Sequence, residues 1–378
     1  MTQRVYFDHA ATTPINQEVG AVMMQAMEEL FGNPSSIHAD GRKTRAAIEK
    51  ARKTVAGIIG ASIGEVFFTS GGTESSNMVL KGAVRDLGVK RIISSPIEHH
   101  CVLHSLDHLA SEEGTEIVLL EVDPKGRISY ETLEAILRSD PKPTLVSLMH
   151  ANNEIGTLHD IERIGAICAE HGAYFHSDTV QTLGFYPLDV AKARLHFCTG
   201  SAHKFHGPKG CGFVYINSDS MLRPFIDGGG QERNMRAGTE NVAGILGLAK
   251  ALDMAQQTME ERRQQILAVK NRLKSGLETL VPGITFNGEE GHAQHYKILS
   301  AAFPPGPRTE LLLFNLDIAG VSASGGSACS SGADAGSHVI GAIDPGGEKK
   351  TIRFSFAHTN TLAEADRVLE VVGGLMGH

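Results

Sequence analysis

Residues 173–181 read Ala-Tyr-Phe-His-Ser-Asp-Thr-Val-Gln, and residues 195–204 read Leu-His-Phe-Cys-Thr-Gly-Ser-Ala-His-Lys. Each stretch is a short apolar run followed by polar side chains, which is typical of a buried strand that leads into a loop. Asp178 follows the first run and Lys204 follows the second. In a parallel sheet ligands bind beyond the carboxyl ends of the strands, so these two stretches predict both the fold class and the place of the site.

Similar apolar runs lie on both sides of this pair, and segments with helical spacing of apolar residues separate them. The further runs are Val66–Thr69, Arg91–Ser94, Ile117–Leu120, Leu145–Leu148 and Phe213–Ile216. Alternating strands and helices predict an α/β fold around a mostly parallel sheet. Strand and helix signals restart after Pro282-Gly283. We therefore predict a large α/β domain at 15–255 and a smaller α+β domain formed by 1–14 and 256–378.

Composition excludes several classes of protein. The chain has 378 residues, 35 Lys and Arg, 43 Asp and Glu, and a formal net charge of −8, which argues against a dedicated nucleic-acid binder. It has no secretory leader pattern and no apolar run of about 18 residues, so we expect a cytoplasmic protein without a membrane role. The five cysteines form no C-x-x-C pair, which favours a reducing compartment without disulfides.

A glycine turn follows the run that ends near Thr69. Gly71 and Gly72 precede Thr73, which begins a helical pattern. The N–H groups and the positive dipole end of such a helix can hold a phosphate. A plain strand–helix turn with a Ser or Thr cap is the alternative, and the spacing matches neither a P-loop nor G-x-G-x-x-G.

Lys204 and Asp178 suggest a specific cofactor. A lysine at a strand end, flanked by Ser201, His203 and a Gly-Pro turn, suits a desolvated amine that forms a Schiff base. An Asp from a neighbouring strand would pair with the ring nitrogen of pyridoxal phosphate. Either residue alone is more often part of a solvated loop, but a phosphate turn, an Asp and a Lys in this order favour the cofactor.

Cys329 lies among small residues, in Ser324-Gly-Gly-Ser-Ala-Cys-Ser-Ser-Gly332. A thiol in a mobile loop of this kind is a candidate nucleophile, although a Gly/Ser stretch is often only a loop. Cys168 and Cys198 lie in apolar runs, which predicts buried, inert thiols.

Histidines follow the run that ends at Ser94. His99, His100 and Cys101 are consecutive, and positions 100, 104 and 108 would share one helical face. A metal site is one interpretation. The other is that His99 stacks on a flat cofactor ring and moves protons while its neighbours form a helix surface.

Arg353 interrupts an apolar strand pattern at 351–356. A buried arginine needs an anion, and a bidentate carboxylate is its natural partner. A carboxylate ligand and a structural salt bridge are both open from this segment.

Taken together, the chain resembles the cysteine desulfurases, pyridoxal-phosphate enzymes of the class V aminotransferase superfamily. The resemblance extends from residue 6 to residue 355 and implies fold type I of the pyridoxal-phosphate-dependent transferases. The motifs that carry it are Asn33-Pro-Ser-Ser-Ile-His38, Thr69-Ser-Gly-Gly-Thr-Glu74, Asn152-Asn-Glu-Ile-Gly156, Ser201-Ala-His-Lys204, Arg236-Ala-Gly-Thr-Glu-Asn241 and Gly326-Ser-Ala-Cys-Ser330. The last of these is similar to the long-loop group of the family.

The resemblance also implies roles for individual residues. Lys204 would carry the cofactor, Asp178 would pair with its ring nitrogen, and His99 would stack on the ring and move protons. The other cofactor contacts would be Gly72, Thr73, Ser201 and His203 at the phosphate, Asn153 and Gln181 at the ring oxygen, and Thr239 from the second subunit of a homodimer. The substrate contacts would be Arg353, Asn33 and Asn153.

The implied reaction converts L-cysteine to L-alanine. Cys329 would take the sulfur as a persulfide and pass it to an acceptor protein, in iron–sulfur cluster assembly or tRNA thiolation. A selenocysteine lyase or another class V aminotransferase-like enzyme is the alternative within the superfamily. A metal-binding or sulfur-relay module built on His99, His100 and Cys101 is the alternative outside it.

Overall fold

The computed structural model describes residues 4–326 and 336–377. The strands are β1 (Val5–Tyr6), β2 (Val66–Thr69), β3 (Arg91–Ser94), β4 (Glu116–Leu119), β5 (Thr144–Ser147), β6 (Tyr174–Asp178), β7 (Phe197–Ser201), β8 (Gly212–Ile216), β9 (Thr285–Asn287), β10 (Ile298–Phe303), β11 (Val321–Ser322) and β12 (Lys350–Ser355). The helices are α1 (Gln17–Glu29), α2 (Ala39–Ile59), α3 (Gly72–Leu87), α4 (His100–Glu113), α5 (Tyr130–Ser139), α6 (Ile161–Glu170), α7 (Gln231–Asn234), α8 (Val242–Gln257), α9 (Met259–Leu280), α10 (Leu312–Ile318), α11 (His338–Ile343) and α12 (Leu362–Met376). The 3-10 turns are η1 (Ile63–Glu65), η2 (Ala202–Lys204), η3 (Ser218–Ser220) and η4 (Gly291–Ala293).

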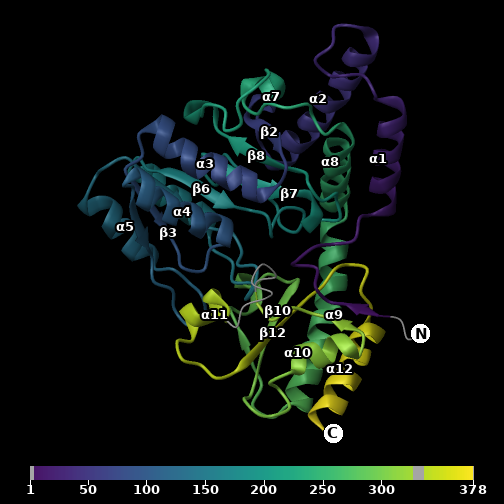
Figure 1. Ribbon diagram of the computed structural model, residues 1–378. Coiled ribbons are helices and arrows are strands. Elements are labelled where there is room, and N and C mark those ends of the chain that lie inside the picture. Colours follow the sequence, from purple (N-terminus) through teal and green to yellow (C-terminus); the bar gives the residue numbers. More distant parts are fainter. Residues whose placement is uncertain (1–3, 327–335, 378) are drawn as a thin grey trace.

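A seven-stranded sheet in the order β2-β8-β7-β6-β5-β3-β4 forms the centre of the larger part of the molecule (Figure 1). The strands from β7 to β4 are parallel to one another, whereas β8 is antiparallel to both β2 and β7. The α/β class with a mostly parallel sheet is therefore confirmed. The parallel pairing of β6 with β7 places Asp178 beside Thr199, so both strands end at the same edge of the sheet.

Helices cover both faces of this sheet because successive strand residues point to opposite sides. Phe67 packs in a core with α3 and α4, whereas its neighbour Phe68 packs in a second core with α2, α5, α6 and α8. Both phenylalanines are at most 3% exposed. Burial on both faces explains why the strands read as continuous apolar runs in the sequence.

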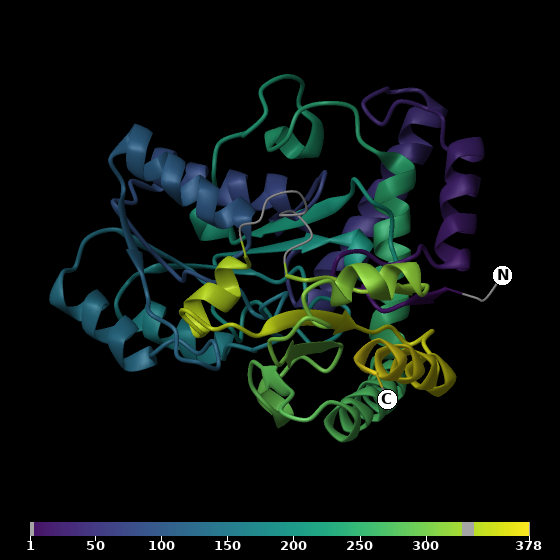
Figure 2. The ribbon, with the colours of Figure 1, turned by 60° about the horizontal axis from the view of Figure 1, so that its bottom comes forward.

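A smaller part of the molecule contains the long helix α9 and lies below the large sheet in the view of Figure 1 (Figures 1 and 2). Its three-stranded antiparallel sheet has the order β12-β10-β9, and α12 packs against α9. Helices α8 and α9 follow one another directly and meet at Thr258. β1 pairs with β11, so Val5 and Tyr6 join this part. On this pairing we retain as a proposal the division into 15–255 and 1–14 with 256–378.

A buried ion pair fixes the turn that contains α7. Arg52 of α2 is 2% exposed and donates to both carboxylate oxygens of Glu232, at 2.6 and 2.9 Å. Glu232 also accepts from the backbone N–H of Phe68 in β2, at 2.7 Å. Residues 232–234 all have left-handed backbone angles, with φ of 44°, 57° and 64°. Such angles are strained for residues other than glycine, so we infer that the ion pair holds this turn in place.

Among the described residues, no helix is long and apolar enough to cross a membrane. The cysteines among them, Cys101, Cys168, Cys198 and Cys211, are not joined by disulfides. Cys168 and Cys198 are fully buried, as predicted, and burial raises the pKa of the Cys198 thiol to about 12.

Candidate active site

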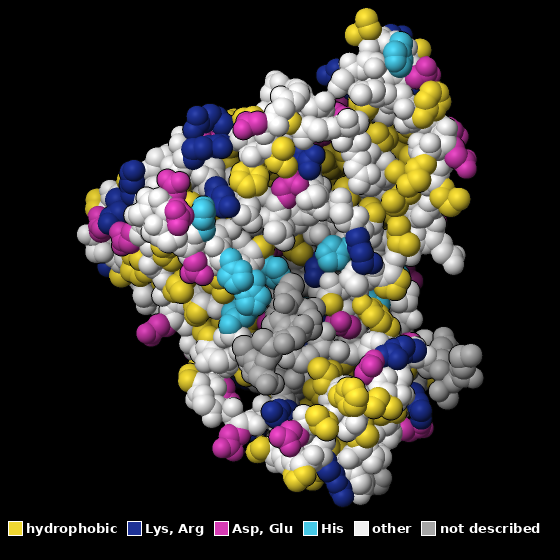
Figure 3. Space-filling view, viewed as in Figure 1, with side chains coloured by type: hydrophobic (Ala, Val, Ile, Leu, Met, Phe, Trp, Pro, Cys, Tyr) yellow, Lys and Arg dark blue, Asp and Glu magenta, His cyan; other side chains and the backbone are white. Residues whose placement is uncertain are grey.

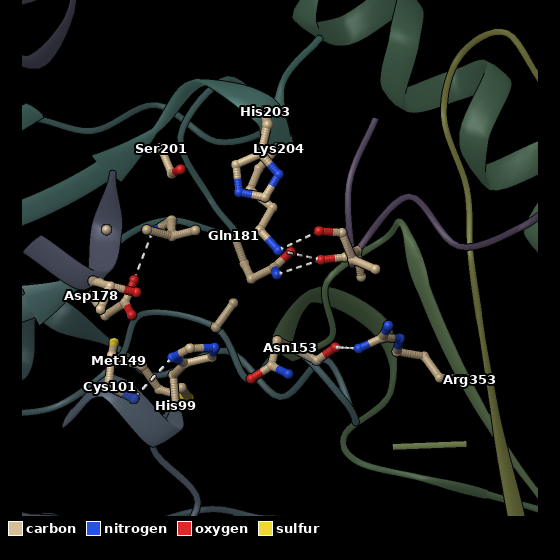
Figure 4. A pocket seen from close by; sticks show the side chains of 16 residues that line it. His99, Cys101, Met149, Asn153, Asp178, Gln181, Ser201, His203, Lys204 and Arg353 are labelled. Atoms are coloured by element: carbon tan, nitrogen blue, oxygen red, sulfur yellow. Dashed lines mark hydrogen bonds between the residues drawn. The ribbon is translucent and has the colours of Figure 1, made fainter. Parts of the chain in front are cut away.

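A cavity of about 260 Å³ opens at the carboxyl ends of β6 and β7 (Figure 4). This is the edge of the sheet at which the sequence placed a ligand. The predicted residues that line the cavity are Gly72, Thr73, His99, Asn153, Asp178, Gln181, Ser201, His203, Lys204 and Arg353. Ala10, Ala11, Cys101, Met149, Ala151 and Val180 complete the lining.

Lys204 is the last residue of η2, directly after β7. Its Nζ donates to the backbone oxygens of Ala10 and Ala11, at 2.7 and 2.8 Å. The N-terminal segment is held there by further bonds, among them Thr13 N to the backbone oxygen of His203 at 2.9 Å. Sequence reasoning missed this contact because backbone oxygens leave no side-chain signal.

Asp178 ends β6 and is 8% exposed. Its Oδ1 accepts from the backbone N–H of Val180 at 2.9 Å. Burial raises the pKa of Asp178, while His99 and Lys204 act in the opposite direction. The carboxyl group is therefore a buried acceptor whose charge depends on positive neighbours.

His99 is the N-cap of α4 and has an extended backbone, with φ −63° and ψ 146°. Its Nδ1 accepts from the backbone N–H of Cys101 at 3.2 Å (Figure 4). Burial lowers the pKa of His99, although Asp178 opposes this shift. A neutral ring whose Nδ1 accepts a hydrogen bond carries its proton on Nε2. The cap thus determines which nitrogen of His99 can donate a proton.

The first turn of α3 forms another wall of the cavity. Gly71 precedes the helix with φ 151°, a value that disfavours side chains. Strand β8 passes close behind Gly71. A Cβ atom added to Gly212 of this strand would lie only 2.6 Å from the Gly71 Cα. Gly72 and Thr73 therefore present the positive end of α3 to the cavity, beside Ser201 and His203.

The polar groups that line the cavity can be compared with the chemical groups of pyridoxal phosphate. The amide oxygen of Gln181 is buried and has no hydrogen-bond partner among the described residues, while its Nε2 donates to Ala10 O at 3.1 Å. An amine, a buried carboxylate and a helix N-terminus surround the same cavity. This donor set matches the aldehyde, the ring nitrogen and the phosphate of the cofactor, so the residues fit the group.

Arg353 of β12 is 2% exposed and lines the same cavity. Its Nη2 donates to Asp8 Oδ1 at 2.9 Å, and its Nη1 donates to the backbone oxygen of Asn153 at 2.9 Å. The structural salt bridge left open by the sequence is therefore present. Nε is buried without a hydrogen-bond partner in the described part of the chain. Asp8 was not among the predicted site residues.

Three predicted residues are not placed at the cavity. Asn33 lies on an exposed loop between α1 and α2, where its side chain accepts from Ser35 N at 2.9 Å. Thr239 lines a separate cavity beside Phe68 and Arg236. Cys329 lies outside the described residues.

Imidazoles gather near the centre of one face of the molecule (Figure 3). The ring of His100 lies 5.2 Å from that of His104 and 4.4 Å from that of His338 in α11, measured between centroids. Within residues 4–326 and 336–377, no group of three or more His, Cys, Asp or Glu side chains could hold a metal ion.

The fold and this site define a class of enzyme, and comparison with known proteins identifies it. The family model "Aminotransferase class-V" matches residues 5–368. "Cysteine desulfurase IscS" of Dictyoglomus turgidum is 42% identical, over 98% of this chain and 94% of that protein. "Putative cysteine desulfurase IscS 1" of Bacillus subtilis is 41% identical, over 98% and 99%. The solved structure "NIFS-LIKE PROTEIN" has a TM-score of 0.91 at 36% identity and covers 99% of each chain. The chain belongs to the cysteine desulfurase family of the class-V aminotransferases, which depend on pyridoxal phosphate.

Proposed function

We propose that this chain converts L-cysteine to L-alanine and transfers the released sulfur to an acceptor through a persulfide on Cys329. The observation that carries the proposal is that Lys204, Asp178 and His99 surround one cavity in a chain whose relatives are named cysteine desulfurases. L-cysteine as substrate and a role in sulfur transfer follow from the family.

In this proposal the lining residues hold pyridoxal phosphate. Lys204 would bind its aldehyde carbon and Asp178 its ring nitrogen. The phosphate would lie against Gly72, Thr73, Ser201 and His203, and the ring oxygen near Asn153 and Gln181. When bound, the cofactor supplies an electron sink that acidifies the substrate α-carbon.

Protein groups around the cavity control the protons. Ala10 and Ala11 orient the Lys204 amine through two hydrogen bonds, which fixes the direction of its lone pair or proton. The capped ring of His99 keeps a proton on Nε2. The ring would stack on the cofactor, and Nε2 would exchange its proton with the substrate. The burial of Asp178 keeps water away from its carboxylate, which strengthens its interaction with a protonated ring nitrogen.

Arg353 is the proposed anchor for the substrate carboxylate. Its guanidinium already bonds Asp8 and the backbone of Asn153, so these partners orient the planar group at the cavity. A guanidinium has five N–H donors, and two bonds leave others for a ligand. The Asn153 side chain also lines the cavity and would contact the same substrate. Asn33 remains a proposed substrate contact, although it does not line the cavity of its own chain.

Cys329 is the proposed nucleophile. Its thiolate would attack the substrate sulfur, so that a carbon–sulfur bond breaks and a sulfur–sulfur bond forms. The substrate carbon would then take a proton, which completes alanine without any external oxidant. The persulfide would pass to an acceptor protein of iron–sulfur assembly or tRNA thiolation. We also propose a cytoplasmic homodimer in which Thr239 reaches the phosphate of the partner's cofactor.

The test begins with cofactor content. The purified protein is expected to show the visible absorption of bound pyridoxal phosphate and to form equal amounts of alanine and transferable sulfur from L-cysteine. Lys204→Ala should lose the covalent attachment that borohydride reduction traps. The control Lys209→Ala, which alters an exposed lysine five residues away, should retain it. A wild-type protein that binds no pyridoxal phosphate would refute the proposal.

The sulfur step has its own test. Cys329→Ser should retain the cofactor absorption and lose persulfide formation, since a hydroxyl cannot accept sulfane sulfur. Full retention of sulfur release would place the nucleophile elsewhere, as expected for a selenocysteine lyase or another relative. Titration with candidate acceptor proteins after ³⁵S-cysteine labelling then identifies which of them receives the sulfur.

A further inference from the structure

Glu98 is a fully buried acidic residue that the proposed reaction does not use. It lies between β3 and α4, next to His99, and is 1% exposed. Its Oε1 accepts from the backbone N–H of Met149 at 2.8 Å and from Ser95 Oγ at 3.2 Å. Its Oε2 is buried and has no hydrogen-bond partner among the described residues. Carboxyl groups are rarely buried in this way without a cationic partner.

The bonds of Glu98 join the segment that carries His99 to the other walls of the cavity. Met149 follows β5 and lines the cavity itself. The backbone oxygen of Glu98 accepts from His338 Nε2 at 2.9 Å, which ties the segment to α11. The adjacent backbone oxygen, that of Ile97, accepts from Asn152 Nδ2 at 2.8 Å. The position of His99 therefore depends on the turn that precedes it. The Glu98 side chain connects this turn to the segment after β5, and the backbone oxygens of Ile97 and Glu98 connect it to Asn152 and His338.

We propose that Glu98 positions His99 as an uncharged carboxylic acid, so that Asp178 is the acidic side chain that carries the negative charge at the base of the cavity. Glu98 is a positioning residue here, since it acts through His99 and Met149 and not on the substrate. The proposal rests on the proposed function, because His99 matters only where the cavity holds the cofactor.

The surroundings of Glu98 support the uncharged form. Two donors reach Oε1, whereas an ionised carboxylate offers about four acceptor sites and loses most of its hydration on burial. The charged groups that act on it also oppose ionisation. Burial raises the pKa of Glu98 to about 8, and the charge of Asp178 adds to the shift, while the bonds from Met149 N and Ser95 act against it.

The other titratable groups around Glu98 give it no counter-charge. Cys101 of α4 interacts with it electrostatically, and burial raises the pKa of that thiol to about 12, so it stays protonated. His338 donates from Nε2 to the Glu98 backbone oxygen and not to its carboxyl group. Among the described residues, Asp178 is the charged side chain that acts on the ionisation of Glu98. A deprotonated Glu98 would thus place a second negative charge near Asp178.

The experiment compares Glu98→Gln, Glu98→Ala and the control Glu113→Gln in the holoenzyme. Gln keeps an oxygen that can accept from Met149 N and Ser95, and it cannot ionise. At pH 7 we expect the kcat/KM of E98Q to be at least tenfold higher than that of E98A. Glu113 is exposed at the end of α4, the helix that His99 caps, and E113Q should match the wild type.

A pH titration of the visible cofactor absorption supplies a readout that a purely structural role would not change. Wild type and E113Q are expected to show a transition near pH 8 as Glu98 ionises, and E98Q to lack it. The proposal is overturned if E98Q retains this transition, or if E98Q loses as much kcat/KM as E98A while it still binds the cofactor. The titration of E98Q decides the question even where E98A does not fold. Failure of the wild type to bind pyridoxal phosphate would instead refute the proposed function.

Discussion

Replacing Glu98 with Gln should stabilise the protein, and by an amount that depends on pH. Folding raises the pKa of Glu98 from its ordinary value of 4.5 to about 8, chiefly by burial. The native state therefore keeps a proton that the unfolded chain releases. This effect costs nothing below pH 4.5, and the destabilisation grows as the pH rises from 4.5 toward 8.

The size of the effect follows from the linkage relation. Each pH unit within this interval costs about 1.4 kcal/mol of unfolding free energy, less near its ends. Between pH 5 and pH 7 the wild type should lose about 2.5 kcal/mol relative to E98Q from this group alone. Gln does not titrate, so the difference between the two proteins isolates Glu98 from all other ionisable groups.

Guanidinium unfolding of both proteins at pH 5, 6 and 7 measures this difference. The stability of E98Q relative to the wild type should increase steadily as the pH rises, and E113Q is the control for removal of an exposed glutamate. A difference between E98Q and wild type that is constant from pH 5 to pH 7 would refute the reasoning, because it would mean that Glu98 has the same pKa in the folded and unfolded chains.

Three further predictions concern named ion pairs and cavity residues. Arg52→Met should cost about 3–5 kcal/mol in guanidinium unfolding, because it leaves Glu232 buried without its partner, and adding Glu232→Gln should recover part of the loss; an unchanged midpoint for the single variant would contradict this. Asp178→Asn should lower kcat roughly 10²-fold while the cofactor stays bound, because a neutral amide stabilises a protonated ring nitrogen poorly; steady-state kinetics with an absorption spectrum would show an active variant if this is wrong. Arg353→Lys should raise the KM for L-cysteine about tenfold with a smaller change in kcat, since an ammonium group cannot replace the planar guanidinium fork that bonds Asp8 and Asn153; an unchanged KM would remove Arg353 from substrate binding.

Most strands of the large sheet could be predicted because they are buried on both faces, whereas the edge strand β4 is partly exposed. Val66–Thr69 and Arg91–Ser94 match β2 and β3 residue for residue. The antiparallel direction of β8 could not be predicted, since an apolar run such as Phe213–Ile216 has the same composition in either direction. The expected helix surface from His100 to His104 formed, but its contact with His338 depends on a residue distant in sequence.

The site residues that directly follow an apolar run could be predicted from the sequence. Asp178 and Lys204 follow apolar runs, so the sheet brings them together. Asp8 and the backbone oxygens of Ala10 and Ala11 were missed, because only the crossing of the N-terminal segment places them at the cavity. The carboxyl group of Glu98 was missed for a similar reason: its burial is a property of the packed molecule, and its neighbours in sequence do not reveal it.

The N-terminal segment also sets an order of events during synthesis. Asp8 bonds Arg353, which lies 345 residues further along the chain, and β1 pairs with β11. At the usual speed of a ribosome those residues emerge roughly 17 to 70 s apart. The large sheet can therefore collapse long before the segment that anchors Lys204 finds its own partners. A nascent chain released early would carry the lysine and the aspartate of the cavity, yet it would lack the strand and the arginine that fix the N-terminal segment beside them.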